Sequence, residues 1–313
     1  MLHLRAVCPV DVTDRALAVL KAHPGATHVV LLRGAAIAPA GDVVEADLAR
    51  EATDEVVASL CDLGVDRDGG VTLEQIDTAL SDAADRAQDA APGEGADAVV
   101  WDELLSRTGE ESRLNATFLA FLTIACLLAA VGVVTNSTVT LVGAMVVGPE
   151  FGPLAAISVG LVLKRWDLVR RAALALAVGF PVAMLITVIG AQIGSFTGLF
   201  DRQTVINQHD FDFVYTVGPF SLIVALLAGA AGMLSMTSAK SAALVGVFIS
   251  VTTVPAAGYA AVAAVLGEWE RFAQSTGQLV VNLVGIVVAA SLVLAVRSRK
   301  NRADDPGRPL STG

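Results

Sequence analysis

Charged side chains are scarce in this chain of 313 residues, at 17% against 54% hydrophobic residues. Soluble globular domains carry about 25% charged residues, so we do not expect water to be the only solvent of this protein. Cysteines are scarce too: Cys8, Cys61 and Cys126 have neither the spacing of a disulfide framework nor that of a zinc site. We therefore expect no metal site and interpret the cysteines as small apolar residues.

Basic residues are few in the first third of the chain, where residues 1–112 contain 22 Asp and Glu but 8 Lys and Arg. Residues 113–313 contain 9 acidic and 13 basic residues. Because binding to phosphates requires clustered Lys and Arg, the acidic first part excludes strong non-specific binding to nucleic acid. The division predicts an acidic soluble head followed by a weakly basic membrane body.

Residues 1–80 predict a small α+β head. Alternating apolar residues indicate strands, and helical spacing separates them in two places. The strands are expected at 2–10, 27–32, 42–49 and 70–76, and the helices at 11–22 and 53–63. This βαββαβ order is typical of a ferredoxin-like fold, which small ligand-binding regulatory domains use. We place this head in the cytoplasm.

The head lacks the residue patterns of an active site. His3, His23 and His28 have no convergent spacing, and we interpret them as ordinary histidines. No nucleophile has a partnered base, and no glycine-rich phosphate loop is present. We therefore expect neither an enzyme nor a bound cofactor.

Residues 81–112 predict a connection between the head and the membrane. Ala, Asp, Pro and Gly dominate 81–95, as is typical of a flexible acidic linker. After it, Ala98, Trp101 and Leu105 share one helical face. We expect a juxtamembrane amphipathic helix with Trp101 as its anchor in the interface.

Residues 113–297 contain apolar runs of the length that crosses a bilayer, about 20 residues each. Six helical spans are expected, at 116–134, 139–163, 172–193, 217–236, 242–266 and 278–296. Lys and Arg gather in the loop at 164–171 and in the tail at 298–313. The positive-inside rule places that loop and both termini in the cytoplasm.

The second three spans repeat the first three at an offset of 103 residues. Leu141-Val142-Gly143 pairs with Leu244-Val245-Gly246, and Trp166 pairs with Trp269. Because three is an odd number, two such copies (about 115–195 and 217–297) must enter the membrane from opposite sides. The sequence predicts a 3+3 inverted repeat, as in many secondary transporters.

The middle span of each copy is interrupted by prolines, in Gly148-Pro149-Glu150 and again before Pro255. The backbone groups freed in this way need protein, water or a solute as partners. Glu150 is the only acidic residue expected within a span, which makes it a candidate proton or cation site. The predicted substrate- or ion-binding residues are Asn136, Ser137, Gly148, Pro149, Glu150, Gly152, Pro153, Thr252, Thr253 and Pro255.

These residues also fit purely structural roles. The prolines can bend two helices for close packing, and Glu150 can be protonated and bonded to a neighbouring span. Asn136 and Ser137 can cap a helix start as well as line an entrance. Trp166 and Trp269, like Trp101, are expected to be anchors at the membrane interface.

Several of these residues resemble a known family. Asn136-Ser137, Leu141-Val142-Gly143-Ala144-Met145, Pro149 and Pro153 and then Trp166 are similar to motifs of the DUF389 family of prokaryotic membrane proteins, whose function is not assigned. The resemblance implies a prokaryotic cytoplasmic (inner) membrane location and a ferredoxin-like head. Glu150 and Ala256 depart from the family pattern.

The sequence favours a transporter or channel-like permease for a small ion or polar solute, with a regulatory head that binds a small ligand. The alternative is a non-transporting sensor or scaffold whose head binds a ligand or partner. Runs of small residues such as 228–232 suit close helix packing, so a homo-oligomer in the lipid bilayer is expected.

Overall fold

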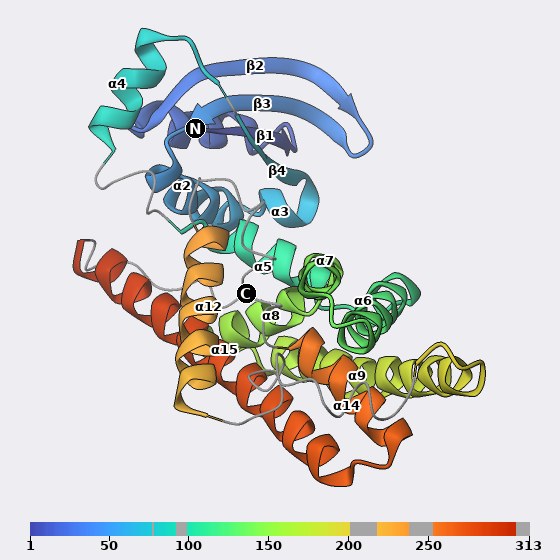
Figure 1. The fold of residues 1–313 in the computed structure, drawn as a ribbon. Coiled ribbons are helices and arrows are strands. Elements are labelled where there is room, and N and C mark those ends of the chain that lie inside the picture. Colours follow the sequence, from blue (N-terminus) through green and yellow to red (C-terminus); the bar gives the residue numbers. More distant parts are fainter. Residues whose placement is uncertain (77, 92–98, 201–217, 238–252, 305–313) are drawn as a thin grey trace. The chain divides into compact units, whose positions relative to one another are not determined.

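The computed structural model describes residues 1–76, 78–91, 99–200, 218–237 and 253–304 (Figure 1). The chain divides into two compact units. The first is mainly Met1–Leu104, and the second is mainly Leu105–Met236 with Lys240–Ser298. We call them the head and the membrane unit.

The head contains the small antiparallel sheet expected of it. Its strand order is β2-β3-β1-β4, which is the order of a split βαβ sheet. Leu4, Leu20 and Leu60 are fully buried in a core that joins one face of the sheet to α1 and α2. The elements are β1 (Leu2–Cys8), α1 (Thr13–Ala22), β2 (Ala26–Ile37), β3 (Ala40–Leu48), α2 (Arg50–Asp62), α3 (Val65–Asp68) and β4 (Gly70–Gln75).

The segment expected to be a flexible linker contains a helix, α4 (Asp82–Ala90). The Ser81 side chain caps it by accepting hydrogen bonds from the backbone amides of Ala83 and Ala84. Alanine has the highest helix propensity, and Ala84 and Ala87 are buried. The linker prediction was therefore wrong for residues 82–90. Their composition is that of a linker, but the Ser81 cap and the buried alanines stabilise a helix.

The membrane unit is helical. Among the described residues, four helices are long and apolar enough to cross a bilayer, and a fifth candidate span is the bent pair α7 and α8. The helices are α5 (Trp101–Glu111), α6 (Ala116–Val134), α7 (Thr138–Val147), α8 (Phe151–Val162), α9 (Trp166–Phe196), α12 (Pro219–Thr237), α14 (Val254–Leu266) and α15 (Trp269–Asp304). This composition fits a multi-pass membrane protein.

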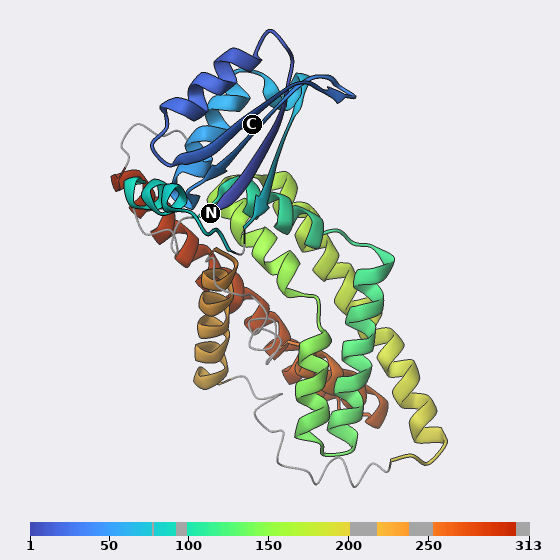
Figure 2. The same cartoon turned by 90° about the horizontal axis from the view of Figure 1, so that it is seen from above.

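Small residues allow these helices to approach closely. Helix α14 packs against α6 and α9, and α9 packs against both α6 and α8; Figure 2 shows α9 running alongside α6. A Cβ atom at Gly258 of α14 would lie 2.6 Å from the Cβ of Ala129 in α6. Gly229 of α12 similarly faces the backbone of Ile286 in α15. Such contacts replace the hydrophobic effect that lipid cannot supply.

Candidate functional site

The expected interruption of the second span is present. Helix α7 ends at Val147 and α8 begins at Phe151, with a bend of 50° between them. Gly148 is extended, and Pro149 has no amide hydrogen to continue the helical ladder. The residues between the two helices are named here the first break.

Glu150 lies in the first break and is fully buried. Its Oε1 accepts a hydrogen bond of 2.6 Å from the Oγ1 of Thr253, which is also fully buried. Thr253 immediately precedes α14, and Pro255 occupies the first turn of that helix. Two residues predicted for the site from distant parts of the chain are thus brought into direct contact.

A carboxylate in this position is costly as an isolated charge. Moving it out of water costs several kcal/mol unless it is paired or takes up a proton. Within the described parts of the membrane unit, Glu150 is the one buried acidic or basic side chain. This burial fits the proton or cation site expected of Glu150 from the sequence.

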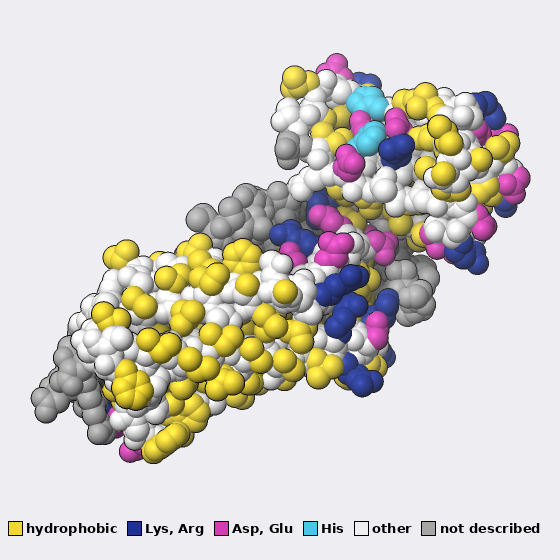
Figure 3. Space-filling model, turned by 90° about the vertical axis from the view of Figure 1, so that its right-hand side faces the viewer, with side chains coloured by type: hydrophobic (Ala, Val, Ile, Leu, Met, Phe, Trp, Pro, Cys, Tyr) yellow, Lys and Arg dark blue, Asp and Glu magenta, His cyan; other side chains and the backbone are white. Residues whose placement is uncertain are grey.

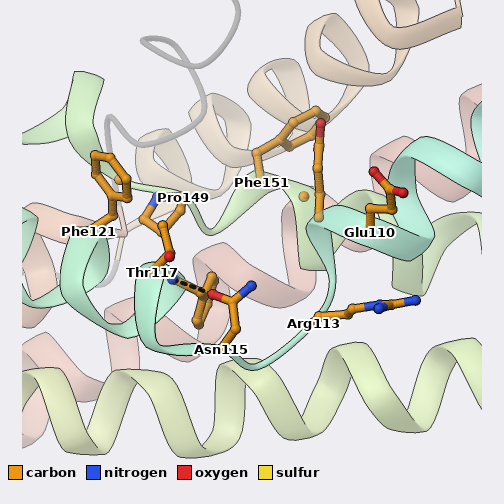
Figure 4. Close-up of a pocket in the computed structure, with 11 residues that line it drawn as sticks. Glu110, Arg113, Asn115, Thr117, Phe121, Pro149 and Phe151 are labelled. Carbon is orange, nitrogen blue, oxygen red and sulfur yellow. Dashed lines mark hydrogen bonds between the residues drawn. The ribbon is translucent and has the colours of Figure 1, made fainter.

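A pocket of about 330 Å³ reaches the first break. Figure 4 shows Glu110 and Arg113 at one side of it and Phe121 and Pro149 at the other. Two of the residues that line it, Pro149 and Phe151, are the neighbours of Glu150 in the sequence. It is lined by Glu110, Glu111, Arg113, Asn115, Thr117, Phe118, Phe121, Gly148, Pro149, Phe151 and Gly152.

Residues of the pocket wall are held by local bonds. The Oδ1 of Asn115 accepts a 2.7 Å hydrogen bond from the amide of Phe118 and so caps α6 (Figure 4). A Cβ atom on Gly152 would lie 2.6 Å from the Cβ of Glu111, so a side chain would not fit there. Pro153 is buried in the first turn of α8.

Other predicted residues lie elsewhere. Asn136 has a φ of 52° after the end of α6, and the Oγ of Ser137 caps α7 by accepting from the amide of Thr140. Both lie at the opposite end of α7 from the first break, about 15 Å along the helix. Thr252 falls outside the described residues.

The three tryptophans differ in exposure. Trp166 and Trp269 are 63% and 67% exposed at the starts of α9 and α15. Trp101 is 8% exposed, and its backbone amide donates to Asp54 within the head. An anchor in the membrane interface needs an exposed ring, so this burial does not fit the role expected of Trp101.

Two features were missed from the sequence. One is the pocket, whose polar residues Glu110, Arg113 and Asn115 lie before the first span. The other is a hydrogen-bonded set on α12 and α15, in which the Oγ of Ser221 donates to Gln278 and Gln278 donates to Asn282. Two carboxamides four residues apart at the start of an apolar run were a detectable sign of the second.

The head brings together two of its histidines. The Nδ1 atoms of His3 and His28 lie 2.8 and 2.7 Å from the two carboxylate oxygens of Asp47. Burial raises the pKa of Asp47, but these hydrogen bonds outweigh it and hold the pKa below its usual value. Among the residues described, no set of three His, Cys, Asp or Glu side chains could hold a metal ion.

One comparison with known proteins gave a relative of unassigned function. An uncharacterized protein of Methanocaldococcus jannaschii is 21% identical over 197 residues, or 63% of this chain. The chain spans 59% of that relative's length. No solved structure matches.

A second comparison concerns the family. Residues 145–288, which include the first break and Thr253, match the model described as "Domain of unknown function (DUF389)". The resemblance noted in the sequence is therefore confirmed over residues 145–288.

Proposed function

We propose that this protein is a permease of the prokaryotic cytoplasmic membrane for a small ion or polar solute, with six spans in a 3+3 inverted repeat. The observation that carries the proposal is the buried bond between Glu150 and Thr253. Broken helices that meet inside a membrane protein are typical of transporter binding sites. The head is proposed to regulate the permease from the cytoplasm.

Helix boundaries support the inverted repeat. Helices α6, α8 and α9 begin at residues 116, 151 and 166, and α12, α14 and α15 begin at 219, 254 and 269. Each start in the second group follows its counterpart by 103 residues, which is also the separation of Glu150 and Thr253. Helices α6 and α12 have the same length of 19 residues.

The C-terminal ends of α8 and α14 also support the inverted repeat. After α8, the amide of Arg165 donates to the carbonyl of Gly160, and after α14 the amide of Glu268 donates to that of Ala263. The residues between, Lys164 and Gly267, both have positive φ, at 58° and 76°. Each member of the second set again follows its counterpart by 103 residues.

The contact between Glu150 and Thr253 has a specific meaning in such a repeat. Residues related by a two-fold axis touch each other only when both lie near that axis. The bond therefore supports a meeting of the two interrupted spans at the centre of the membrane unit. A solute crossing between the repeats would pass this point.

Charge supports the orientation. Figure 3 shows Lys and Arg side chains gathered at one end of the apolar face of the membrane unit. Lys164, Arg170 and Arg171 are exposed around the start of α9, whereas Glu270 is exposed at the start of α15. The positive-inside rule assigns the basic end, and with it the pocket beside Arg113, to the cytoplasm.

The test is flux through liposomes that contain the purified full-length protein. Osmotic response to KCl, NaCl, urea and acetamide is followed by stopped-flow light scattering. At least one solute should cross faster than in empty liposomes. Glu150→Gln should change that rate about tenfold, because glutamine can still accept the bond from Thr253 but cannot carry a charge or exchange a proton, and bonds to charged groups are stronger than those to neutral ones. Glu270→Gln is the matched control because Glu270 is exposed.

Equal rates with and without protein for all four solutes would contradict the proposal. A changed rate in Glu270→Gln as large as in Glu150→Gln would contradict the role of the buried contact.

A further inference from the structure

A second set of buried polar groups lies between α12 and α15. The Oγ of Ser221 lies 3.1 Å from the Oε1 of Gln278 and 2.9 Å from the carbonyl of Gly218, and its one hydrogen serves these two acceptors. The Nε2 of Gln278 donates to the Oδ1 of Asn282 at 2.9 Å. Gln278 is 1% exposed and Asn282 is fully buried. We name these three residues the amide cluster.

The first half of the chain packs the corresponding helices without polar groups. Counting back 103 residues from Ser221, Gln278 and Asn282 gives Phe118, Ala175 and Gly179. There the ring of Phe118 fills the space beside Gly179, where a Cβ atom would lie 2.8 Å from the ring. Close packing of α12 on α15 therefore does not require an amide, although burying one costs free energy unless every polar atom is bonded.

The amide cluster continues toward the Glu150–Thr253 contact. The Oγ of Ser275, one turn before Gln278, donates a 2.8 Å hydrogen bond to the carbonyl of Ala256. Ala256 lies one turn after Thr253 at the start of α14. Ser275 and Thr253 are both fully buried, so polar groups follow one another from the first break into α15.

The chemistry of the amide cluster is uncharged. One hydroxyl and two carboxamides offer hydrogen-bond donors and acceptors together, which suits a solute that carries both. A net charge on the solute would meet no opposite charge within the cluster and would carry a large desolvation cost. Hydrogen bonds between the three side chains can be exchanged one by one for bonds to such a solute.

We propose that Ser221, Gln278 and Asn282 form a second binding site on the permeation route, specific for a small uncharged solute with an amide or hydroxyl group. This inference rests on the proposed function. In the proposed topology α6 and α12 start at opposite membrane faces. The site would then lie on the other side of the Glu150–Thr253 contact from the pocket.

The test uses acetamide and urea as probes and KCl as the charged comparison, with the full-length protein in liposomes. The substitutions Gln278→Met and Asn282→Leu keep similar volumes and remove the amides. Ser221→Ala is a milder variant at a half-buried position. Gln274→Met is the matched control, because Gln274 lies one turn earlier on α15 and is exposed.

We expect acetamide or urea flux to exceed KCl flux, to fall about tenfold in Gln278→Met or Asn282→Leu, and to stay unchanged in Gln274→Met. Neutral flux that depends on Glu150 but not on the amide cluster would overturn this inference and leave the permease proposal standing. Flux of KCl alone would overturn the solute class. No flux of any solute would overturn the permease proposal itself.

Discussion

At the scale of single residues, the membrane unit places one carboxyl group where a charge is hardest to hold. Glu150 has the hydroxyl of Thr253 at 2.6 Å and no exposure to solvent. Its bond joins parts of the chain that are 103 residues apart. Loss of either side chain therefore affects the starts of both α8 and α14.

Thr253→Val should destabilise the protein by about 1–3 kcal/mol, because a buried acceptor then loses its donor. Thr253→Ser keeps the hydroxyl and should cost less. Thermal unfolding in detergent measures both. In a Glu150→Leu background the same Thr253→Val change should cost clearly less, since no acceptor remains. Equal costs in the two backgrounds would show that the bond contributes nothing.

Asp47 is the residue for which a pH dependence is expected. Its folded pKa lies below the unfolded value because His3 and His28 donate to its oxygens. A lowered pKa contributes stability above the unfolded value, and that stability is lost as pH falls through the folded one. The contribution is therefore present at pH 7 and absent in strong acid.

Asp47→Asn should raise hydrogen exchange in Leu2–Cys8 at pH 7, since β1 pairs with β3 at His3 and Asp47. The excess over the natural protein should shrink as the pH is lowered below about 4, the ordinary range of an aspartate. An excess that stays constant across this range would contradict the electrostatic explanation.

At the scale of elements, close helix contacts depend on glycines, which have no side chain to keep the neighbouring helix away. Gly258 is the clearest case in α14, since its nearest neighbours are Ala129 and the backbone of Ala130 in α6. Because Ala130 contributes backbone atoms, the neighbour cannot simply rotate away. A larger residue must push α14 from α6 and disturb the adjacent Thr253.

Gly258→Val should lower stability by about 1–3 kcal/mol through overpacking. Gly277→Ala in α15 is the control, because a Cβ atom there meets nothing within 4 Å. Unfolding midpoints in detergent compare the two. Similar losses of stability in both variants would show that the loss does not come from the contact between Gly258 and α6.

Helices and strands were predicted correctly where a single pattern of hydrophobic residues determines the secondary structure. The strands of the head and the long helices α6, α9, α12 and α15 follow from alternation and apolar length. Helix α4 was missed because acidic, alanine-rich composition suggested a linker. The first break was predicted from Pro149, whose missing amide hydrogen acts locally.

Contacts between distant elements were harder to predict. Glu150 and Thr253 were both on the predicted site, but their contact depends on how α8 and α14 pack. For the amide cluster, the spacing of Gln278 and Asn282 was a detectable sign, but their contact with Ser221 depends on how α12 packs against α15. The burial of Trp101 was not predicted, because an apolar helical face does not reveal whether lipid or protein covers it.

At the scale of the whole molecule, the repeat and the membrane orientation make one joint prediction. Residues at the starts of α9 and α15 should lie on opposite sides of the membrane. Single cysteines at Arg170 and Glu270, in a protein lacking Cys8, Cys61 and Cys126, can report this through a membrane-impermeant thiol reagent. Both chosen side chains are exposed.

Arg170→Cys should be labelled from the cytoplasmic side and Glu270→Cys from the outside of intact cells. Labelling after the membrane is opened supplies the control that both cysteines are reactive. Labelling of both cysteines from the same side would contradict the three spans proposed between them. It would also contradict the proposed inverted repeat.

The pair formed by Glu150 and Thr253 also breaks the symmetry that brings it together. In a perfect two-fold repeat, the two conformations that the rotation exchanges would have the same free energy. A carboxyl group on one member and a hydroxyl on the other make them unequal. If the proposed permease function holds, we expect the protein to rest in one conformation, and protonation of Glu150 to alter the balance between the two.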